Sequence, residues 1–316
     1  MAAALHVVFG GGQAGSLLAD RLFAAGHRVR LVKRNPAIVP EGIGLHLGDA
    51  ADPSFCERAV EGAAAVYHCL HPPYDRRAWA QFLPLFMTNL VRAAGRAGAR
   101  LVVLDNLYAL GRPAGRPLDE DTPVAPCSRK GEIRAQVAQQ LFDAHARGEV
   151  RAIVGRASDF YGPRGTLTVF GDRFWPAVFA GKKAKLPLAM ATPHTYHYLP
   201  DVAAGLAALA AAPEDMIGRA WMLPCAQAVS SREMVVRFGQ ALDGPIDAAE
   251  MPRWFIKASA RFVPIVREVD EMLYQWDEPF VVDDRRIRER IGLVPTDADA
   301  AARATVEWAR QHYAKG

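Results

Sequence analysis

The residues with the clearest chemical purpose are three glycines near the start of the chain. Gly10, Gly12 and Gly15 follow the apolar run at 7–9 and open a segment whose apolar residues recur at helical spacing. A strand, a G-x-G-x-x-G turn, a helix and a second strand are typical of a dinucleotide-binding unit. Such glycines allow a tight turn and close approach of a pyrophosphate, which the helix N-terminus stabilises. The residues predicted to hold a dinucleotide here are Gly10, Gly12, Gln13, Ala14 and Gly15.

Two cations follow the second predicted strand, at 29–32. Enzymes that prefer NAD usually place an acid at this point to hold the ribose 2′-hydroxyl, whereas this chain has Lys33 and Arg34. Cations attract a 2′-phosphate, and an arginine can bind it through two hydrogen bonds. The two side chains could also be ordinary solvated charges, but the sequence favours NADP over NAD.

The composition is that of a soluble globular protein. The 316 residues suffice for one large or two modest domains, and the net charge of +4 is mild. Because no apolar run is long enough to span a bilayer and basic residues are scattered, we expect neither a membrane nor a nucleic acid as partner. The four cysteines form no C-x-x-C pair, so we predict no disulfide frame and no metal site. The chain enters its first predicted strand at once, so we expect no signal peptide and a cytoplasmic location.

The alternation of strands and helices continues for about half of the chain. Further strands are predicted at 45–49, 64–70, 101–104 and 150–154, and helices after Asp52, at 79–98 and at 130–147. Pro84 should delay or kink the helix at 79–98. This order predicts an α/β fold with a Rossmann-type, doubly wound parallel sheet. We predict an NADP-binding domain over 1–163, joined by a strand at 220–223, and a smaller, mostly helical substrate domain over 164–316 that ends in a helix at 298–313.

Six motifs in this order resemble the extended short-chain dehydrogenase/reductases, also called the NAD-dependent epimerase/dehydratase family. They lie at 10–15, 48–52, 89–94, 156–163, 196–203 and 283–295, so the resemblance covers nearly the whole chain. The resemblance implies that Asp49 contacts the adenine amino group. It also implies that Leu70 and His71 lie near the diphosphate and ribose, and that Tyr161 shapes the nicotinamide pocket. Asp159 stands where the family has Asn, so it would lie near the nicotinamide or cap a turn.

The catalytic part departs from the family's pattern. The family uses a Tyr as general acid/base, a Lys four residues later, an upstream Ser and an Asn. No tyrosine of this chain is followed four residues later by lysine. Ungapped counting places Lys130 at the Tyr position, Arg134 at the Lys position, Asn106 at the Ser position and Leu83 at the Asn position. The chain therefore resembles atypical members, which keep the cofactor fold and lose the standard tetrad.

Four residues could still do chemistry at this place. Lys130 is the leading candidate for proton donor or acceptor, although it could be a solvated residue or bind only phosphate or ribose. Arg134 stays protonated, so we expect it to bind ribose or phosphate. Asn106 could hydrogen-bond a substrate carbonyl or cap its turn. Tyr108 could supply a phenol from another backbone position or serve only for packing.

Three further features have roles that the sequence leaves open. His71 titrates near neutrality in an ordinary environment, but a histidine in a loop is usually polar surface. The cluster at 194–198 lacks the spacing of a metal site, so a pocket wall or domain interface is expected. The segment at 253–276 is predicted to be mostly core, with a share that closes over a partly apolar substrate. Its aromatic residues are Trp254, Phe255, Phe262, Tyr274 and Trp276.

These patterns leave more than one function open. The first hypothesis is an NADP-dependent oxidoreductase or epimerase that acts on a small molecule with a substituted acid/base. The second is a catalytically silent NADP-binding redox sensor, and a weaker third is a structural subunit. Relatives pair the helices that match 79–98 and 130–147 across a two-fold axis, so we expect a homodimer with Phe82, Phe86 and Leu141 in its apolar seam.

Overall fold

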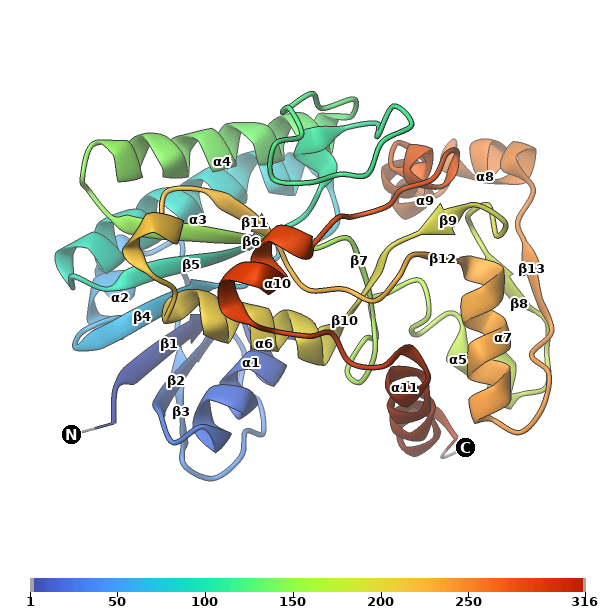
Figure 1. Cartoon of the computed structure of the whole chain (residues 1–316), viewed down its shortest axis with the longest axis horizontal. Coiled ribbons are helices and arrows are strands. Elements are labelled where there is room, and N and C mark those ends of the chain that lie inside the picture. The colour runs from blue at the N-terminus through green and yellow to red at the C-terminus, as the bar shows by residue number, and fades with distance from the viewer. Residues whose placement is uncertain (1–2, 315–316) are drawn as a thin grey trace. The chain divides into compact units, whose positions relative to one another are not determined.

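The computed structural model describes residues 3–314, which divide into two compact units (Figure 1). The first unit comprises the described residues up to 109, together with 129–157 and 202–223. The second comprises 110–128, 158–201 and the described residues from 224 onward. The two units thus alternate along the chain, whereas the sequence analysis predicted a boundary after residue 163 with only the strand at 220–223 returning to the first domain.

The first unit is built on a parallel sheet of seven strands, in the order β11-β6-β5-β4-β1-β2-β3. The strands are β1 (Leu5–Phe9), β2 (Arg28–Lys33), β3 (Ile43–Leu47), β4 (Ala63–His68), β5 (Arg100–Asp105), β6 (Arg151–Arg156) and β11 (Ala220–Met222). β1 is buried along its whole length, because helices cover both faces of the sheet. The predicted α/β, Rossmann-type fold is confirmed, and the strand expected at 220–223 lies at the sheet edge beside β6.

Helices form a layer on each side of this sheet. In Figure 1, α2, α3 and α4 lie on one face, and α1 and α6 lie on the other. Their bounds are α1 (Gln13–Ala24), α2 (Pro53–Ala59), α3 (Arg76–Arg96), α4 (Arg129–Ala146) and α6 (Leu199–Ala210). A short 3-10 turn, η2 (Glu214–Met216), precedes β11.

Pro84 does not delay α3 as expected. The carboxylate of Asp75 caps the helix by accepting hydrogen bonds from the backbone N–H groups of Arg77 and Ala78, both at 2.9 Å. This cap fixes the start at Arg76, so Pro84 falls inside the helix. The Pro84 carbonyl accepts a hydrogen bond from Gln140 of α4 at 3.3 Å. A late start was therefore the wrong expectation, because the capping residue lies upstream of the proline.

The second unit consists of helices, short strand pairs and a separate aromatic core. The pairs are β7 (Asp159–Tyr161) with β10 (Tyr196–Tyr198), β9 (Pro193–His194) with β12 (Val229–Ser230), and β8 (Ala184–Leu186) with β13 (Ala248–Glu250). The helices are α5 (Trp175–Phe179), α7 (Ser231–Ala241), α8 (Arg253–Ala260), α9 (Pro264–Asp270), α10 (Arg285–Ile291) and α11 (Ala298–Tyr313). Phe170, Phe174, Trp175 and Phe238 pack together at its centre. The last helix has the predicted bounds.

Two predictions about apolar side chains need correction. Leu141 is fully buried and Phe86 is 6% exposed, both in the core of the first unit, so they cannot supply a seam to a second copy. A homodimer therefore stays a prediction, but Leu141 and Phe86 do not form its interface. In the segment at 253–276, Trp254, Phe255 and Phe262 are exposed rather than core, while the aromatic rings nearer its end are buried.

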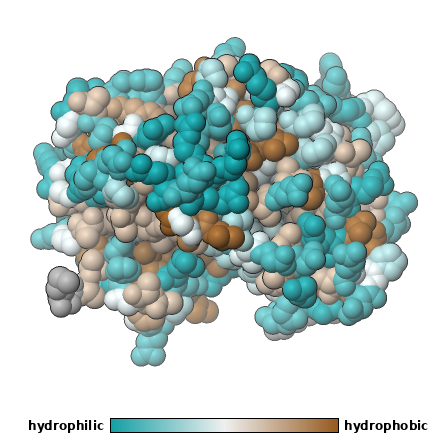
Figure 2. Space-filling model, in the orientation of Figure 1, coloured by the Kyte–Doolittle hydropathy of each residue, from teal (hydrophilic) through white to brown (hydrophobic). Residues whose placement is uncertain are grey.

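Hydrophilic residues dominate the face of the molecule seen in Figure 2, where hydrophobic residues occur in small groups. Within residues 3–314, none of the helices combines the length and the apolar content needed to cross a bilayer.

Arg100, at the start of β5, binds the end of α6 and the residues that follow it. Its buried guanidinium donates hydrogen bonds to the carbonyl groups of Leu209 at 3.2 Å, Ala210 at 3.0 Å and Ala212 at 2.5 Å. It also pairs with Glu214 at 2.8 Å. The carbonyl groups at the end of a helix lack intrahelical donors, so one side chain satisfies several of them.

Replacing Arg100 by Met should lower the free energy of unfolding by about 3 kcal/mol, because buried carbonyl groups lose a charged donor. Arg151→Met is the matched control, since Arg151 also pairs with Glu214 but its side chain is half exposed. That change should alter stability by less than about 1 kcal/mol. Urea unfolding followed by circular dichroism measures both, and equal effects would contradict the role of Arg100.

Candidate functional site

The glycine turn has the geometry of a phosphate cradle. Gly10 has a φ of +102°, and a Cβ there would lie 2.5 Å from the carbonyl oxygen of Cys69. A Cβ on Gly15 would lie 1.8 Å from the carbonyl oxygen of Gly10. By contrast, a Cβ on Gly12 would have no atom within 4 Å. Gly10 and Gly15 therefore allow the turn, α1 and β4 to pack closely, while Gly12 faces open space.

The first turn of α1 offers donors to this open space. Gly12 is the N-cap residue, and no side chain caps the helix there. The backbone N–H groups in the first turn of a helix have no acceptors within the helix. Such groups, with the positive end of the helix dipole, bind phosphate.

A pocket lies beside the turn, at the carboxyl ends of β2, β3 and β4. It brings together five of the predicted cofactor-binding residues, which are Lys33, Arg34, Asp49, Leu70 and His71. Asp49 is held in place because its carboxylate accepts a hydrogen bond from the N–H of Ala51 at 2.9 Å. The stem of Lys33 lies against Gly11, where a Cβ would come within 2.6 Å of Lys33 Cδ. Ligands bind at this edge in open parallel sheets.

Two histidines near the pocket are neutral at physiological pH. Burial and, less strongly, the Arg134 cation lower the pKa of His68 to about 3. Desolvation and then the same cation lower the pKa of His71 to about 4, although the residue is exposed at the surface. The pKa of His71 therefore lies below that of an ordinary histidine, in the same direction as that of His68.

The carboxyl end of β5 carries a buried group of three charges. Asp105 Oδ1 lies 3.4 Å from Arg134 Nη1, and Asp105 Oδ2 lies 3.6 Å from Arg156 Nε. All three residues are at most 7% exposed. The Arg134 guanidinium also lies 4.7 Å from the ring centroid of Trp79. Arg134, predicted to bind ribose or phosphate, is thus already engaged by protein groups.

Lys130 lies one turn before Arg134 on α4 and is completely buried. Its ammonium nitrogen lies 4.7 Å from the ring centroid of Tyr74, in cation–π geometry. The Tyr74 hydroxyl lies 3.4 Å from that of Tyr108, and both tyrosines are half-buried. Lys130 is therefore not a solvated surface residue.

Asn106 Oδ1 accepts a hydrogen bond from the Tyr108 N–H at 3.1 Å. Of the two roles considered for Asn106, the structure shows the capping of its turn.

Tyr74 is the residue of this cluster that the sequence analysis missed. The sequence pointed to Tyr74 only through its position. It lies six residues after the end of β4, in a loop that begins at the edge of the parallel sheet where ligands bind. The ring stacks beside His71 with centroids 6.2 Å apart and meets Trp79 edge-on at 5.5 Å. The ring of this loop residue thus covers the buried ammonium group and is itself packed against Trp79 of α3.

The remaining predicted residue, Asp159, belongs to the second unit. Its carboxylate lies 3.0 Å from His194 Nε2, and His194 Nδ1 lies 3.2 Å from the carbonyl oxygen of Gln275. The His194 ring is stacked against Trp276 and Phe280. The cluster at 194–198 is buried inside this unit. Among residues 3–314, no three His, Cys, Asp or Glu side chains gather closely enough to hold a metal ion.

A glycine turn at a helix N-terminus, beside a pocket at the carboxyl edge of a parallel sheet, defines a dinucleotide-binding protein of the Rossmann class. The chain belongs to the NAD-dependent epimerase/dehydratase family, whose model matches residues 6–222. The resemblance inferred from the motifs is thereby confirmed. No curated protein matches the chain.

Solved structures share the fold over nearly the whole chain. The structure of gox2253 has a TM-score of 0.79 and 22% sequence identity, with 98% of each chain covered. UDP-glucuronic acid 4-epimerase from Bacillus cereus, in complex with NAD, has a TM-score of 0.80 and 14% identity, covering 99% of this chain and 98% of its own. UDP-glucose 4-epimerase from Thermotoga maritima, with UDP-glucose, has a TM-score of 0.78 and 15% identity, covering 98% and 99%. At these identities the similarity establishes the fold.

Gly12→Ala should weaken dinucleotide binding at least about tenfold, because a methyl group would displace phosphate from the helix N–H groups. Stability should change by no more than about 1 kcal/mol, since no atom opposes the new Cβ. Gly15→Ala is the contrasting variant, which should destabilise the fold itself by about 1–3 kcal/mol. Nucleotide titration and thermal unfolding separate the two effects, and unchanged binding in Gly12→Ala would refute the cradle.

Proposed function

We propose that this protein is an NADP-dependent oxidoreductase or epimerase for a small, partly apolar substrate, with Lys130 and two tyrosines in place of the family's Tyr-x-x-x-Lys. The observation that carries the proposal is the buried Lys130 ammonium beneath Tyr74, whose hydroxyl meets that of Tyr108. This cluster lies in the same unit as the glycine turn. Family membership supports a nicotinamide cofactor.

The residues of the first unit fit such a cofactor. The open space at Gly12 suits a diphosphate, and Asp49 suits an adenine amino group. Lys33 and Arg34 line the same pocket, where they would hold a 2′-phosphate. A bound nicotinamide would supply the oxidising or reducing equivalents of the reaction.

The proton chemistry is assigned to the two phenols, with Lys130 behind them. Because Lys130 is completely buried, its charge reaches a substrate only through the groups that cover it. A cation against the Tyr74 ring stabilises negative charge on a nearby phenol oxygen, and hydroxyl groups in contact can pass a proton. We propose that Tyr108 exchanges the proton with the substrate, that Tyr74 links it to Lys130, and that Asn106 holds the Tyr108 backbone in place.

A second candidate is a catalytically silent NADP-binding redox sensor. The observation that favours it is the engagement of both tetrad-position cations by the protein itself. Lys130 is fully buried and Arg134 is bound by Asp105, so the structure presents neither of them on its surface. Such a protein would keep the cofactor pocket and respond to its occupancy.

NADPH should bind at least about tenfold more tightly than NADH, because charge-assisted hydrogen bonds to a phosphate contribute roughly 1.5–3 kcal/mol each. Arg34→Ala should abolish most of this preference. Arg28→Ala is the matched control, since Arg28 is an exposed arginine at the opposite end of β2. Fluorescence titration with both nucleotides measures the preference, and equal affinities in the unaltered protein would argue against NADP.

Lys130→Met should lower turnover by about 10²-fold or more, with NADPH binding little changed, because the charge behind the phenols is lost. Tyr108→Phe should cause a similar loss, since it removes the hydroxyl that exchanges the proton. The measurement is NADPH consumption with a panel of aldehydes, ketones and nucleotide sugars.

The pattern among these variants decides between the assignments. Tyr313→Phe is the control and should keep full activity. It removes a hydroxyl group that donates a hydrogen bond to Asp172 in the second unit. Loss of turnover in Lys130→Met but not in Tyr108→Phe would show that the phenol assignment is wrong. If the unaltered protein binds NADPH tightly and consumes none with any substrate, the sensor hypothesis gains.

A further inference from the structure

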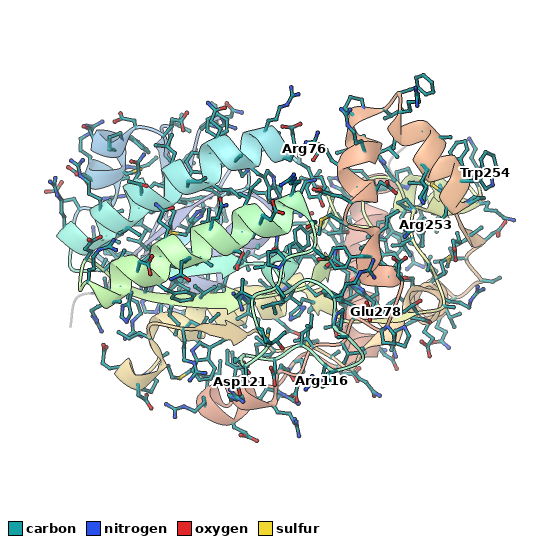
Figure 3. All side chains as sticks on the ribbon, turned by 90° about the horizontal axis from the view of Figure 1, so that it is seen from above. Arg76, Arg116, Asp121, Arg253, Trp254 and Glu278 are labelled. Atoms are coloured by element: carbon teal, nitrogen blue, oxygen red, sulfur yellow. The ribbon has the colours of Figure 1, made fainter. Side chains whose placement is uncertain are left out.

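The second unit carries a concentrated group of exposed hydrophobic side chains on α8 and on the turn before α9. Trp254 is 72% exposed, Phe255 46%, Phe262 81% and Val263 41%. These four lie within ten consecutive positions, while the buried Ile256 anchors the helix to the core. We call residues 253–263 the aromatic–basic segment. Figure 3 shows Trp254 directed outward from α8.

Cations surround these rings. Residues 253–267 include four basic side chains and no acid, and the first acid that follows, Glu268, is buried. Arg253 is paired with Asp277 at 2.7 Å. Lys257 and Arg261 are exposed and have no ion-pair partner among residues 3–314.

The charges and rings share one side of the helix. At about 100° per residue, Lys257 and Arg261 lie about 60° and 20° from Trp254 around the axis. Ile256 points about 160° away from Trp254, toward the core. The exposed side therefore combines an indole ring with two unpaired cations, and Phe255 flanks it.

We propose that the aromatic–basic segment docks the protein onto the surface of an anionic phospholipid bilayer. Trp and Phe rings enter the boundary between headgroups and acyl chains, while neighbouring Lys and Arg side chains bind lipid phosphates. Charge complementarity identifies the occupant, because the exposed cations Lys257 and Arg261 beside apolar rings match anionic headgroups above an apolar layer. The expectation of no membrane partner rested on the absence of a spanning run, which a surface-bound helix does not need.

This inference does not depend on the proposed chemistry, since the segment lies in the second unit and the cofactor pocket in the first. The test is co-sedimentation of the full chain with vesicles of phosphatidylcholine alone or with added phosphatidylglycerol. The protein should bind the anionic vesicles, bind phosphatidylcholine vesicles far more weakly, and be released by high salt.

Two double variants separate the charges from the rings. Lys257→Gln with Arg261→Gln should weaken binding to anionic vesicles by more than tenfold, since each cation contributes about fivefold. Trp254→Ser with Phe262→Ser should also abolish most binding. Val294→Ser with Leu167→Ser is the matched control, because these residues are 81% and 82% exposed in the same unit but lie outside the segment. Circular dichroism checks that every variant is folded.

Tryptophan fluorescence reports contact directly. Anionic vesicles should shift the emission to shorter wavelength, and Trp254→Phe should remove the shift while it keeps most of the binding. The proposal is overturned if the unaltered protein does not sediment with anionic vesicles, or if the control variant loses binding as the segment variants do. It is also overturned if Trp254→Ser with Phe262→Ser leaves vesicle binding unchanged and alters only self-association, measured by light scattering. That result would identify a second copy of the chain as the partner of the segment.

Discussion

The candidate catalytic corner of this protein is built around one buried carboxylate. Asp105 lies between the guanidinium groups of Arg134 and Arg156, so β5, α4 and β6 meet at a single charge. Charges removed from water are tolerated only with close partners, and removal of one partner from a buried pair costs about 3–5 kcal/mol. This constraint fixes how α4 packs on the sheet. Because Lys130 is one turn from Arg134, the same ion pair determines where the buried ammonium lies.

The rest of the corner follows from that placement. Trp79 packs against the Arg134 guanidinium, and Tyr74 and Tyr108 pack beside Trp79. A buried ammonium group needs a source of negative potential, to which the face of the Tyr74 ring contributes. The cofactor-binding part of the unit therefore keeps the glycine turn and pocket expected for its family. In the proposed catalytic part, a covered lysine and two phenols stand in place of the family's Tyr-x-x-x-Lys.

The features predictable from the sequence were those set by local chemistry. The glycine turn, the apolar strands and the last helix depend on residues close together in the chain, and their predicted places are where the structure has them. Lys33 and Arg34 were predicted from their place after the second strand, and Asp49, Leu70 and His71 from the family resemblance. These five residues line one pocket because parallel strands end at the same edge of the sheet. The start of α3 was predicted too late, because Pro84 was given more weight than the cap at Asp75.

The features that escaped prediction depend on contacts between distant residues. The burial of Lys130 requires Tyr74, which is 56 positions earlier and carries no motif. The pairing of Arg134 with Asp105 likewise joins two separate elements, the helix α4 and the strand β5. In the segment at 253–276, aromatic composition suggested a core, but exposure depends on what packs there, and only the rings near its end are covered.

The central claim is that Lys130 and the two tyrosines occupy the catalytic position beside a bound cofactor, and a structure of the complex with NADPH tests it most directly. We predict that the 2′-phosphate contacts Arg34 and that the Tyr108 hydroxyl faces the reactive side of the nicotinamide ring, with Lys130 behind Tyr74. A nicotinamide ring that faces side chains from elsewhere, with Tyr108 and Lys130 directed away from it, would contradict the account.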